Sequence, residues 1–145
     1  MSLILKAFEI AKTQLGVKEV PGDGNSTKVL EYHKATDLKA TSDSVPWCSA
    51  FVNWCVQKAG GKGTRDAMAR SWLNWGKKAA SPQAGDIVVF SRGTDGASGH
   101  VAFVYETPSV MNPMIKVLGG NQDDMVCIKS YARARVLGYR RSLDG

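Results

Sequence analysis

The stretch Pro46-Trp47-Cys48-Ser49-Ala50-Phe51-Val52-Asn53-Trp54-Cys55-Val56-Gln57-Lys58-Ala59-Gly60 opens with proline, closes with glycine and is apolar on most of its faces. Proline is favoured in the first turn of a helix, and glycine is favoured just beyond its end. A helix that is apolar on most faces is buried. The stretch therefore predicts a largely buried central helix.

The segments on either side predict helices first and strands afterwards. Helices are predicted over Ser2–Leu15, from Ser26 or Thr27 to about His33, and over Arg65–Trp75, with residues 36–46 as a loop. Short apolar runs predict strands over Asp86–Phe90, His100–Tyr105, Ile115–Leu118, Met125–Ile128 and Val136–Tyr139. This order is typical of an α+β fold with a mainly antiparallel sheet. The length of 145 residues, without an internal repeat or long linker, predicts that residues 1–145 form a single domain.

Composition excludes several classes of protein. Apolar residues make up 43% and charged residues 22%, as in globular chains. No apolar run approaches the roughly 18 residues of a membrane-spanning helix, and the amphipathic start does not resemble a signal peptide. The net charge of +6 favours an anionic partner. Nucleic acid is not expected, because no nucleic-acid-binding motif accompanies the basic residues, of which only Arg133, Arg135, Arg140 and Arg141 form a loose group.

Cysteine placement singles out Cys48 as a nucleophile. Cys48 and Cys55 are two helical turns apart, about 10 Å, which is beyond disulfide reach. The chain has no Cys-x-x-Cys or His-Glu-x-x-His motif, so no metal site is expected. Cys48 lies in the first turn of the predicted central helix, where the helix dipole should depress the pKa of its thiol. Cys55 and Cys127 do not lie at the start of a predicted helix, so no helix dipole depresses the pKa of their thiols, and they are interpreted as packing residues.

A cysteine nucleophile needs a base and a group that orients the base. Of the two histidines, His100 opens a predicted strand, whereas His33 lies in a polar helix and is expected at the surface. Asn121, after Gly119-Gly120, is the first choice for the orienting residue, with Asp123 and Gln122 behind it. The two glycines are expected to let the backbone turn sharply.

Six blocks follow one another from the central helix to the C-terminus. They are Pro46–Cys55, Ser71–Gly76, Gly85–Phe90, Gly99–Val101, Val117–Gln122 and Leu137–Arg140. In order and spacing they resemble the CHAP-type cysteine, histidine-dependent amidohydrolase/peptidase domains of phage endolysins and bacterial cell-wall hydrolases. The resemblance runs from about Glu19 to Arg140. It implies a papain-like fold, with N-terminal helices packed on the sheet, and hydrolysis of an amide bond in peptidoglycan.

Carried over residue by residue, the resemblance implies Cys48, His100 and Asn121 as the catalytic residues. Cys48 would attack the carbonyl to form a thioester, and His100 would protonate the leaving amine and then activate water. Glu19, Trp47, Gln122 and Trp72 are expected to contact substrate, whereas Trp54 and Trp75 are expected in the core. No cofactor is expected, since the chain lacks an acidic cluster like the calcium loop of better-known CHAP enzymes.

Peptidoglycan is the expected partner of a monomer that has no separate wall-binding domain. Both endopeptidase and N-acetylmuramoyl-L-alanine amidase activity remain open, and so does the second oxyanion donor. Without a signal peptide, the protein is expected in the cytoplasm of a bacterial host, reaching the wall only after release. Two alternatives are a cysteine amidase or deamidase toxin that acts on a protein or small amide, and a catalytically inactive wall-binding module.

Overall fold

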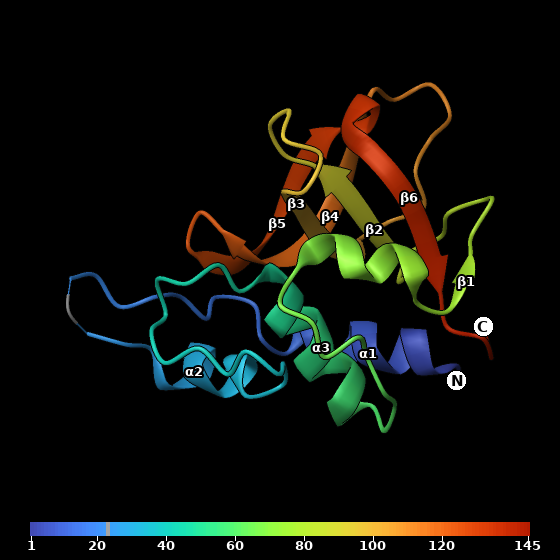
Figure 1. The fold of residues 1–145 in the computed structure, drawn as a ribbon. Coiled ribbons are helices and arrows are strands. Elements are labelled where there is room, and N and C mark those ends of the chain that lie inside the picture. The colour runs from blue at the N-terminus through green and yellow to red at the C-terminus, as the bar shows by residue number, and fades with distance from the viewer. Residues whose placement is uncertain (23) are drawn as a thin grey trace.

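Helices pack on one face of a curved antiparallel sheet (Figure 1). The computed structural model describes residues 1–22 and 24–145. Its helical elements are α1 (Leu3–Lys12), α2 (Thr27–His33), α3 (Cys48–Lys58) and the 3-10 helices η1 (Ala69–Asn74) and η2 (Arg133–Arg135). Its strands are β1 (Lys77–Lys78), β2 (Ile87–Ser91), β3 (Gly99–Val104), β4 (Met114–Gln122), β5 (Met125–Ala132) and β6 (Val136–Arg141). The sheet order β1-β6-β2-β3-β4-β5, with antiparallel pairs, confirms the predicted α+β class.

Helices α1 and α2 begin where the sequence predicts them to begin. The Ser2 hydroxyl accepts a hydrogen bond from the backbone N–H of Leu5, and the Ser26 hydroxyl accepts one from Val29. Both serines satisfy first-turn N–H groups that have no partner within the helix. Helix α3 differs, because Trp47 at its N-cap makes no side-chain capping bond. The first N–H groups of α3 are therefore not capped by Trp47.

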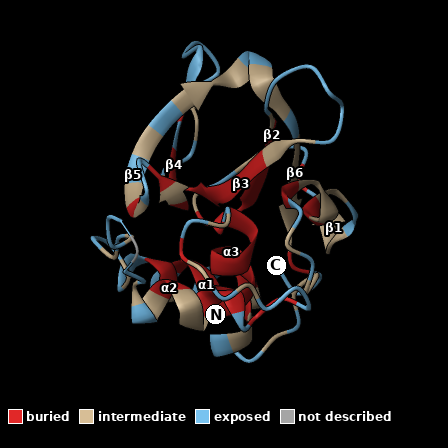
Figure 2. Ribbon diagram, turned by 60° about the vertical axis from the view of Figure 1, so that its left-hand side comes forward, coloured by how far each residue is buried: buried red, intermediate tan, exposed pale blue. Residues whose placement is uncertain are grey.

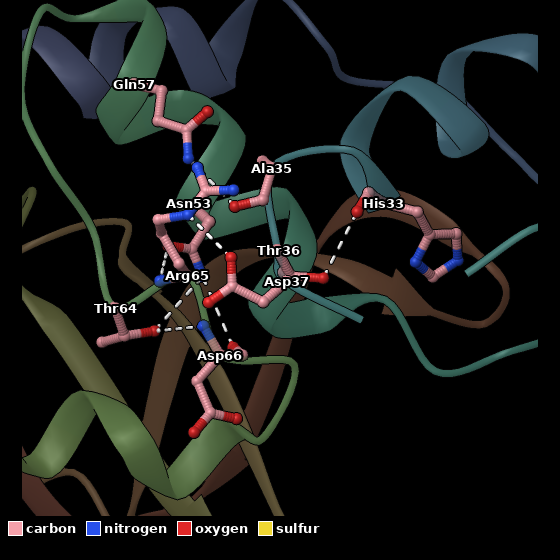
Figure 3. Close-up of polar contacts among 9 residues, drawn as sticks. All are labelled: His33, Ala35, Thr36, Asp37, Asn53, Gln57, Thr64, Arg65 and Asp66. Carbon is pink, nitrogen blue, oxygen red and sulfur yellow. Dashed lines mark hydrogen bonds and ion pairs between the residues drawn. The ribbon is translucent and has the colours of Figure 1, made fainter. Parts of the chain in front are cut away.

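The predicted helix over residues 65–75 is shorter than expected and is a 3-10 helix. Arg65 has a φ of +57°, a left-handed backbone that an α-helix does not contain. The side chain of Asn53 holds this segment, since its Oδ1 accepts the N–H of Arg65 at 2.8 Å and its Nδ2 lies 3.3 Å from Thr64 Oγ1 (Figure 3). Hydrogen bonds from Asn53 of α3 to Thr64 and Arg65 thus take the place of the first helical turn that the sequence predicted.

Two buried clusters occupy the two faces of the sheet. In β3, Val101 and Phe103 belong to the cluster between helices and sheet, which Figure 2 shows in red around α3. Ala102 and Val104 belong to a second cluster on the other face, with Phe90 of β2. The alternation follows from the two-residue period of a strand.

His33 is buried at 1% exposure, so the prediction that it lies at the surface is wrong. Burial lowers the pKa of its imidazole, and backbone groups of Ser42 and Val45 oppose that shift. These contacts arise because the loop after α2 folds back over the helix, which helical spacing alone does not reveal. Figure 3 shows the His33 ring turned away from the polar contacts around Asn53.

Two arginines of the C-terminal strand β6 bind other parts of the protein. Arg141 pairs with the buried Asp86, with Nη2 and Oδ2 2.7 Å apart, and Arg140 Nε donates to the carbonyl of Trp75 at 2.6 Å. These two members of the loose basic group are therefore engaged within the protein. The chain ends meet nearby, where the N–H of Leu3 donates to the Asp144 carboxylate at 3.1 Å. Within the described ranges, no helix has the length and apolarity to cross a membrane.

Candidate active site

Cys48 is the first residue of α3 and lies under the sheet at 6% exposure. Among the described residues, pairing between β3 and β4 is confined to Phe103 with Leu118 and Val104 with Val117. The backbone N–H of Val101, one residue after His100, acts on the Cys48 thiol and lowers its pKa. The thiol therefore lies against the part of β3 that carries His100.

Gly119 and Gly120 allow β4 to approach the start of α3. A Cβ atom at Gly120 would lie 2.7 Å from the Trp47 ring and 2.8 Å from Phe51 Cβ. A Cβ atom at Gly119 would lie 2.6 Å from the side-chain oxygen of Gln122. The glycines are thus needed for close packing, whereas the sequence suggested a sharp turn at these positions.

The pKa of the Cys48 thiol is raised, which corrects the prediction that it is depressed. Burial is the largest cause, because a thiolate loses hydration there. The N–H groups of Val101, Ser49 and Cys48 and the charge of Arg92 all act in the predicted direction, but they do not overcome burial. In the resting protein the nucleophile is therefore a neutral thiol.

His100 is wholly buried, and its imidazole packs against two aromatic rings. Its centroid is 5.1 Å from that of Tyr131 on β5 and 6.3 Å from that of Phe90 on β2. Burial lowers the pKa of the imidazole to about 4, the Gln122 hydrogen bond opposes this shift, and nearby cations add to it. The base is therefore neutral at pH 7.

Gln122 fixes the tautomer of His100. Its Nε2 donates to the backbone carbonyl of Cys127 at 2.7 Å, and its Oε1 lies 2.8 Å from His100 Nε2. A carbonyl only accepts hydrogen bonds, so the amide must turn its oxygen toward the histidine, whose Nε2 must carry the proton. Nδ1 is then an unprotonated lone pair, and it is buried without a hydrogen-bond partner in the described part of the chain. The arrangement provides a proton acceptor of fixed orientation.

The sequence expected Asn121 in the position that Gln122 occupies. Asn121 has a φ of +58° and sits in a register shift of β4 against β5. Asparagine tolerates this left-handed region better than most residues. Asp123 and Asp124 also have positive φ, at +53° and +61°, and form the turn that leads into β5. The structure thus brings Gln122, and not Asn121 or Asp123, to the imidazole.

The residues expected to contact substrate are mostly structural. Trp47 and Trp72 are both 0% exposed, so their rings are unavailable for stacking on a ligand. The indole N–H of Trp47 donates to the Glu19 carboxylate at 2.8 Å, and that of Trp72 donates to the Ser49 hydroxyl at 2.9 Å. Glu19 is half-buried and lines a pocket of about 340 Å³ beside the β4–β5 turn. Of the three residues Trp47, Trp72 and Glu19, only Glu19 faces an open pocket.

Tyr131 is a site residue that the sequence analysis missed. The predicted strand ends at Ile128, but β5 continues to Ala132 and pairs Tyr131 with Ile115. The extension places the Tyr131 ring on the His100 imidazole. A β-favouring aromatic residue at position 131 was the signal available in the sequence, because Lys129-Ser130-Tyr131-Ala132 does not alternate between polar and apolar residues.

The site contains a thiol, a base and an amide. All three cysteines are free thiols. Across residues 1–22 and 24–145, no three His, Cys, Asp or Glu side chains gather in a way that could hold a metal ion. A thiol that lies against the strand carrying a base of fixed tautomer is suited to nucleophilic attack on a carbonyl.

Comparison with protein families assigns the chain to a class of hydrolases. The model of the CHAP domain matches residues 40–121, so the chain belongs to the CHAP domain family of cysteine peptidases and amidases. The match includes Cys48, His100 and Asn121 and stops one residue before Gln122. No curated protein sequence matches the chain.

Two solved structures that are similar to this chain come from NLP/P60-type proteins. A lipoprotein-like protein of the NLP/P60 family from Staphylococcus aureus subsp. aureus Mu50 has a TM-score of 0.58 and 18% identity, and the match covers 99% of this chain and 42% of that one. The P60 domain of an antigen from M. avium subspecies paratuberculosis has a TM-score of 0.57 and 17% identity, with coverage of 99% and 96%. These similarities confirm the papain-like fold.

Proposed function

We propose that this protein is a peptidoglycan hydrolase that cleaves an amide bond of the wall peptide through a thioester on Cys48. The observation that carries the proposal is the hydrogen bond between His100 and Gln122, which leaves Nδ1 as a buried base one residue before Val101, whose backbone N–H acts on the Cys48 thiol. Membership of the CHAP family supports amide hydrolysis as the reaction.

The reaction begins from a neutral pair. The Cys48 thiol transfers its proton to His100 Nδ1 as the sulfur attacks the amide carbonyl, because both groups are uncharged in the resting site. The carbonyl oxygen becomes an oxyanion, and the Cys48 backbone N–H at the start of α3 is a suitable donor to it. Gln122 keeps the imidazole oriented while it carries the proton.

The intermediate then collapses and is hydrolysed. His100 returns the proton to the leaving nitrogen, the C–N bond breaks, and a thioester joins Cys48 to the acyl fragment. Water gives a proton to Nδ1 and attacks the thioester. The thiol is restored as the carboxylic acid leaves. This sequence assigns base and acid roles to one imidazole and the orienting role to Gln122.

Peptidoglycan fits the charge of the protein as well as its family. Wall peptides carry carboxylates, and a protein with a net charge of +6 attracts them. An endolysin-like role as a monomer that acts after release belongs to the same proposal. It is supported by the resemblance of the sequence blocks around Cys48, His100 and Gln122 to those of endolysin domains.

The test compares two cysteine variants on purified cell walls. Cys48→Ala should abolish the release of new amino groups, whereas Cys55→Ala, which changes a buried thiol of the same helix, should retain most of it. Retained release by Cys48→Ala would contradict the thiol mechanism. Release from a protein substrate but not from walls would favour a deamidase or toxin-like amidase.

Mass spectrometry of the digested muropeptides identifies the bond. Stem peptides free of sugar indicate an N-acetylmuramoyl-L-alanine amidase, whereas shortened stems still attached to sugar indicate an endopeptidase. Binding to walls without any product would point to an inactive binding module and contradict the proposal.

A further inference from the structure

The imidazole of His100 is held by one hydrogen bond and by the rings packed against it. The bond between its Nε2 and Gln122 Oε1 sets which nitrogen carries the proton. A ring bound at one atom can still turn about that atom, and such a turn would redirect Nδ1, the proton acceptor of the proposed reaction. The side chains packed on the imidazole must therefore set its plane.

Two aromatic rings lie against the imidazole. The centroid of the Tyr131 ring is 5.1 Å from that of His100, with the ring planes 35° apart, and the centroid of Phe90 is 6.3 Å away, with the planes 24° apart. Tyr131 and Phe90 are 5.0 Å from each other, so the three rings form one cluster. Ring pairs at centroid separations of about 4.5–7 Å attract each other beyond the effect of burial.

The two rings differ in how firmly the fold holds them. Phe90 is wholly buried in β2, where it pairs with His100 on one side and with Val136 on the other. Tyr131 is only half-buried, and it lies on β5, the last strand of the sheet, which pairs with β4 alone. The position of the Tyr131 ring therefore depends on a further contact.

Arg135 provides that contact. Its guanidinium carbon lies 5.5 Å from the centroid of the Tyr131 ring, within the range of cation–π attraction. Its Nε and Nη2 both donate to the carbonyl of Ser91, at 3.1 and 2.9 Å. Ser91 is the last residue of β2 and pairs with Gly99, the residue before His100. The guanidinium thus joins the Tyr131 ring to the strand pair that carries the imidazole.

We propose that Tyr131 and Arg135 are positioning residues that hold the His100 imidazole in the plane in which Nδ1 accepts the proton of Cys48. The inference rests on the proposed function and adds a second constraint on its base. Gln122 sets the tautomer of the imidazole, Tyr131 sets its plane, and Arg135 acts through the Tyr131 ring.

Steady-state kinetics on soluble wall fragments tests the roles of the ring and of the guanidinium. Tyr131→Leu should lower kcat by about 30-fold with little change in KM, because a misoriented base slows the chemical step rather than binding. Tyr131→Phe keeps the ring and should stay within about 3-fold of the unchanged protein. Arg135→Met keeps the chain length but loses the cation and the bonds to Ser91, and it should lower kcat by about 10-fold.

Two control variants make similar losses away from the imidazole. Tyr139→Leu removes another half-buried tyrosine of the same cluster, which pairs with Val88, two residues along β2 from Phe90. Arg133→Met removes a cation of the same 3-10 helix, whose Nη2 donates to the carbonyl of Ser109 at 2.8 Å. Both should keep nearly full kcat. Circular dichroism checks that every variant is folded.

Nitrogen NMR of the histidine side chains tests the proposal in the resting protein, without substrate. The unchanged protein, Tyr131→Phe and both controls should show His100 in the Nε2-protonated form alone, and His100→Asn assigns the signals. Tyr131→Leu and Arg135→Met should show a mixture of tautomers, because an imidazole that turns away from Gln122 loses the bond that selects its tautomer. A loss of stability alone leaves this ratio unchanged in the folded protein.

Unchanged kcat and an unchanged tautomer in both Tyr131→Leu and Arg135→Met would overturn the positioning roles, and so would equal losses in the two controls. A rise in KM alone would also overturn them, since it would assign Tyr131 to substrate binding. Tyr131→Phe as slow as Tyr131→Leu would assign the effect to the hydroxyl and contradict the role of the ring. If the unchanged protein cleaves no wall fragment, the proposed function fails, and the tautomer ratios still decide whether Tyr131 and Arg135 orient the imidazole.

Discussion

The side chain of Gln122 has two neighbours that together define its role. The Gln122 side-chain N–H donates a hydrogen bond to the carbonyl of Cys127, and the Gln122 side-chain oxygen accepts one from His100 Nε2–H. A substitution that removes the amide frees the imidazole to rotate and to change tautomer. At the scale of single residues, we therefore expect catalysis to depend on the amide of Gln122.

Gln122→Met should lower kcat by about 100-fold, because it removes the orienting acceptor but keeps the side-chain volume. Asn121→Gly should keep nearly full kcat, since glycine adopts the positive φ of that position readily. Steady-state kinetics on soluble wall fragments measures both. The reverse ranking would assign the orienting role to Asn121.

The buried imidazole of His100 should make the protein less stable in acid. Its pKa is about 4 in the folded protein and about 6.5 when unfolded, so between these values only the unfolded chain binds the proton. The free energy of unfolding should therefore fall as pH decreases from 6.5 to 4, by about 3 kcal/mol from this group.

Urea denaturation of the unchanged protein and of His100→Asn measures this contribution. His33 shifts in the same direction but is present in both proteins, so its effect cancels in the difference. Parallel stability curves for the two proteins between pH 6.5 and 4 would contradict the account.

Sequence reasoning identified Cys48 and His100 by residue type and by their positions at element ends. It ranked Asn121 above Gln122, because the register shift in β4 that decides which amide points to the imidazole is not visible in a sequence. It also misjudged the thiol pKa, since the helix terminus is visible in a sequence but the depth of burial is not.

At the scale of elements, the contact between β4 and α3 holds the thiol under the sheet. Gly120 lies directly against Trp47 and Phe51, and both are wholly buried. The backbone of β4 can approach this closely only without a side chain at that position.

Gly120→Ala should destabilise the protein by about 1–3 kcal/mol, the usual cost of overpacking a core. Gly138→Ala is the control, because its Cβ would meet only Leu73 Cδ2, at 3.1 Å. Thermal unfolding compares the two. A Tm loss for Gly120→Ala no larger than that for Gly138→Ala would show that β4 does not need the close approach.

Element types were predictable where local chemistry decides them. Ser2 and Ser26 cap helices as expected, and the continuous apolar runs of β2 and β3 are visible in the sequence. The segment before η1 was not predictable, because Asn53 of α3 binds the backbone of Arg65 across the fold. The two-residue strand β1 forms only because β6 pairs with it.

At the scale of the whole molecule, the net charge of +6 should attract the protein to anionic walls over long range. Wall lysis should fall as sodium chloride rises, because screening shortens to about 8 Å at physiological ionic strength. Hydrolysis of a small neutral peptide should change little. Turbidity assays of wall lysis and assays of peptide hydrolysis over one sodium chloride series provide the comparison. Equal salt sensitivity of the two rates would rule out electrostatic attraction of the protein to the wall.

The basic group at the C-terminus was predicted as one surface, but its members differ. Arg140 and Arg141 bind Trp75, Gly76 and Asp86 within the fold, so reversing their charge would damage the structure. Arg135 lies over the ring of Tyr131, which packs on His100. Composition gives the charge of a chain, but only the tertiary contacts show which charges are available to a partner.

The central claim is that the sulfur of Cys48 bonds to the acyl part of a wall peptide. Acid quenching during turnover of soluble wall fragments, followed by intact-mass and peptide-level mass spectrometry, tests it directly. The account predicts a mass increase equal to the acyl fragment, located on the peptide that contains Cys48 and absent from Cys48→Ala. Turnover with no adduct on Cys48 under conditions that trap thioesters, or an adduct on another residue, would contradict it.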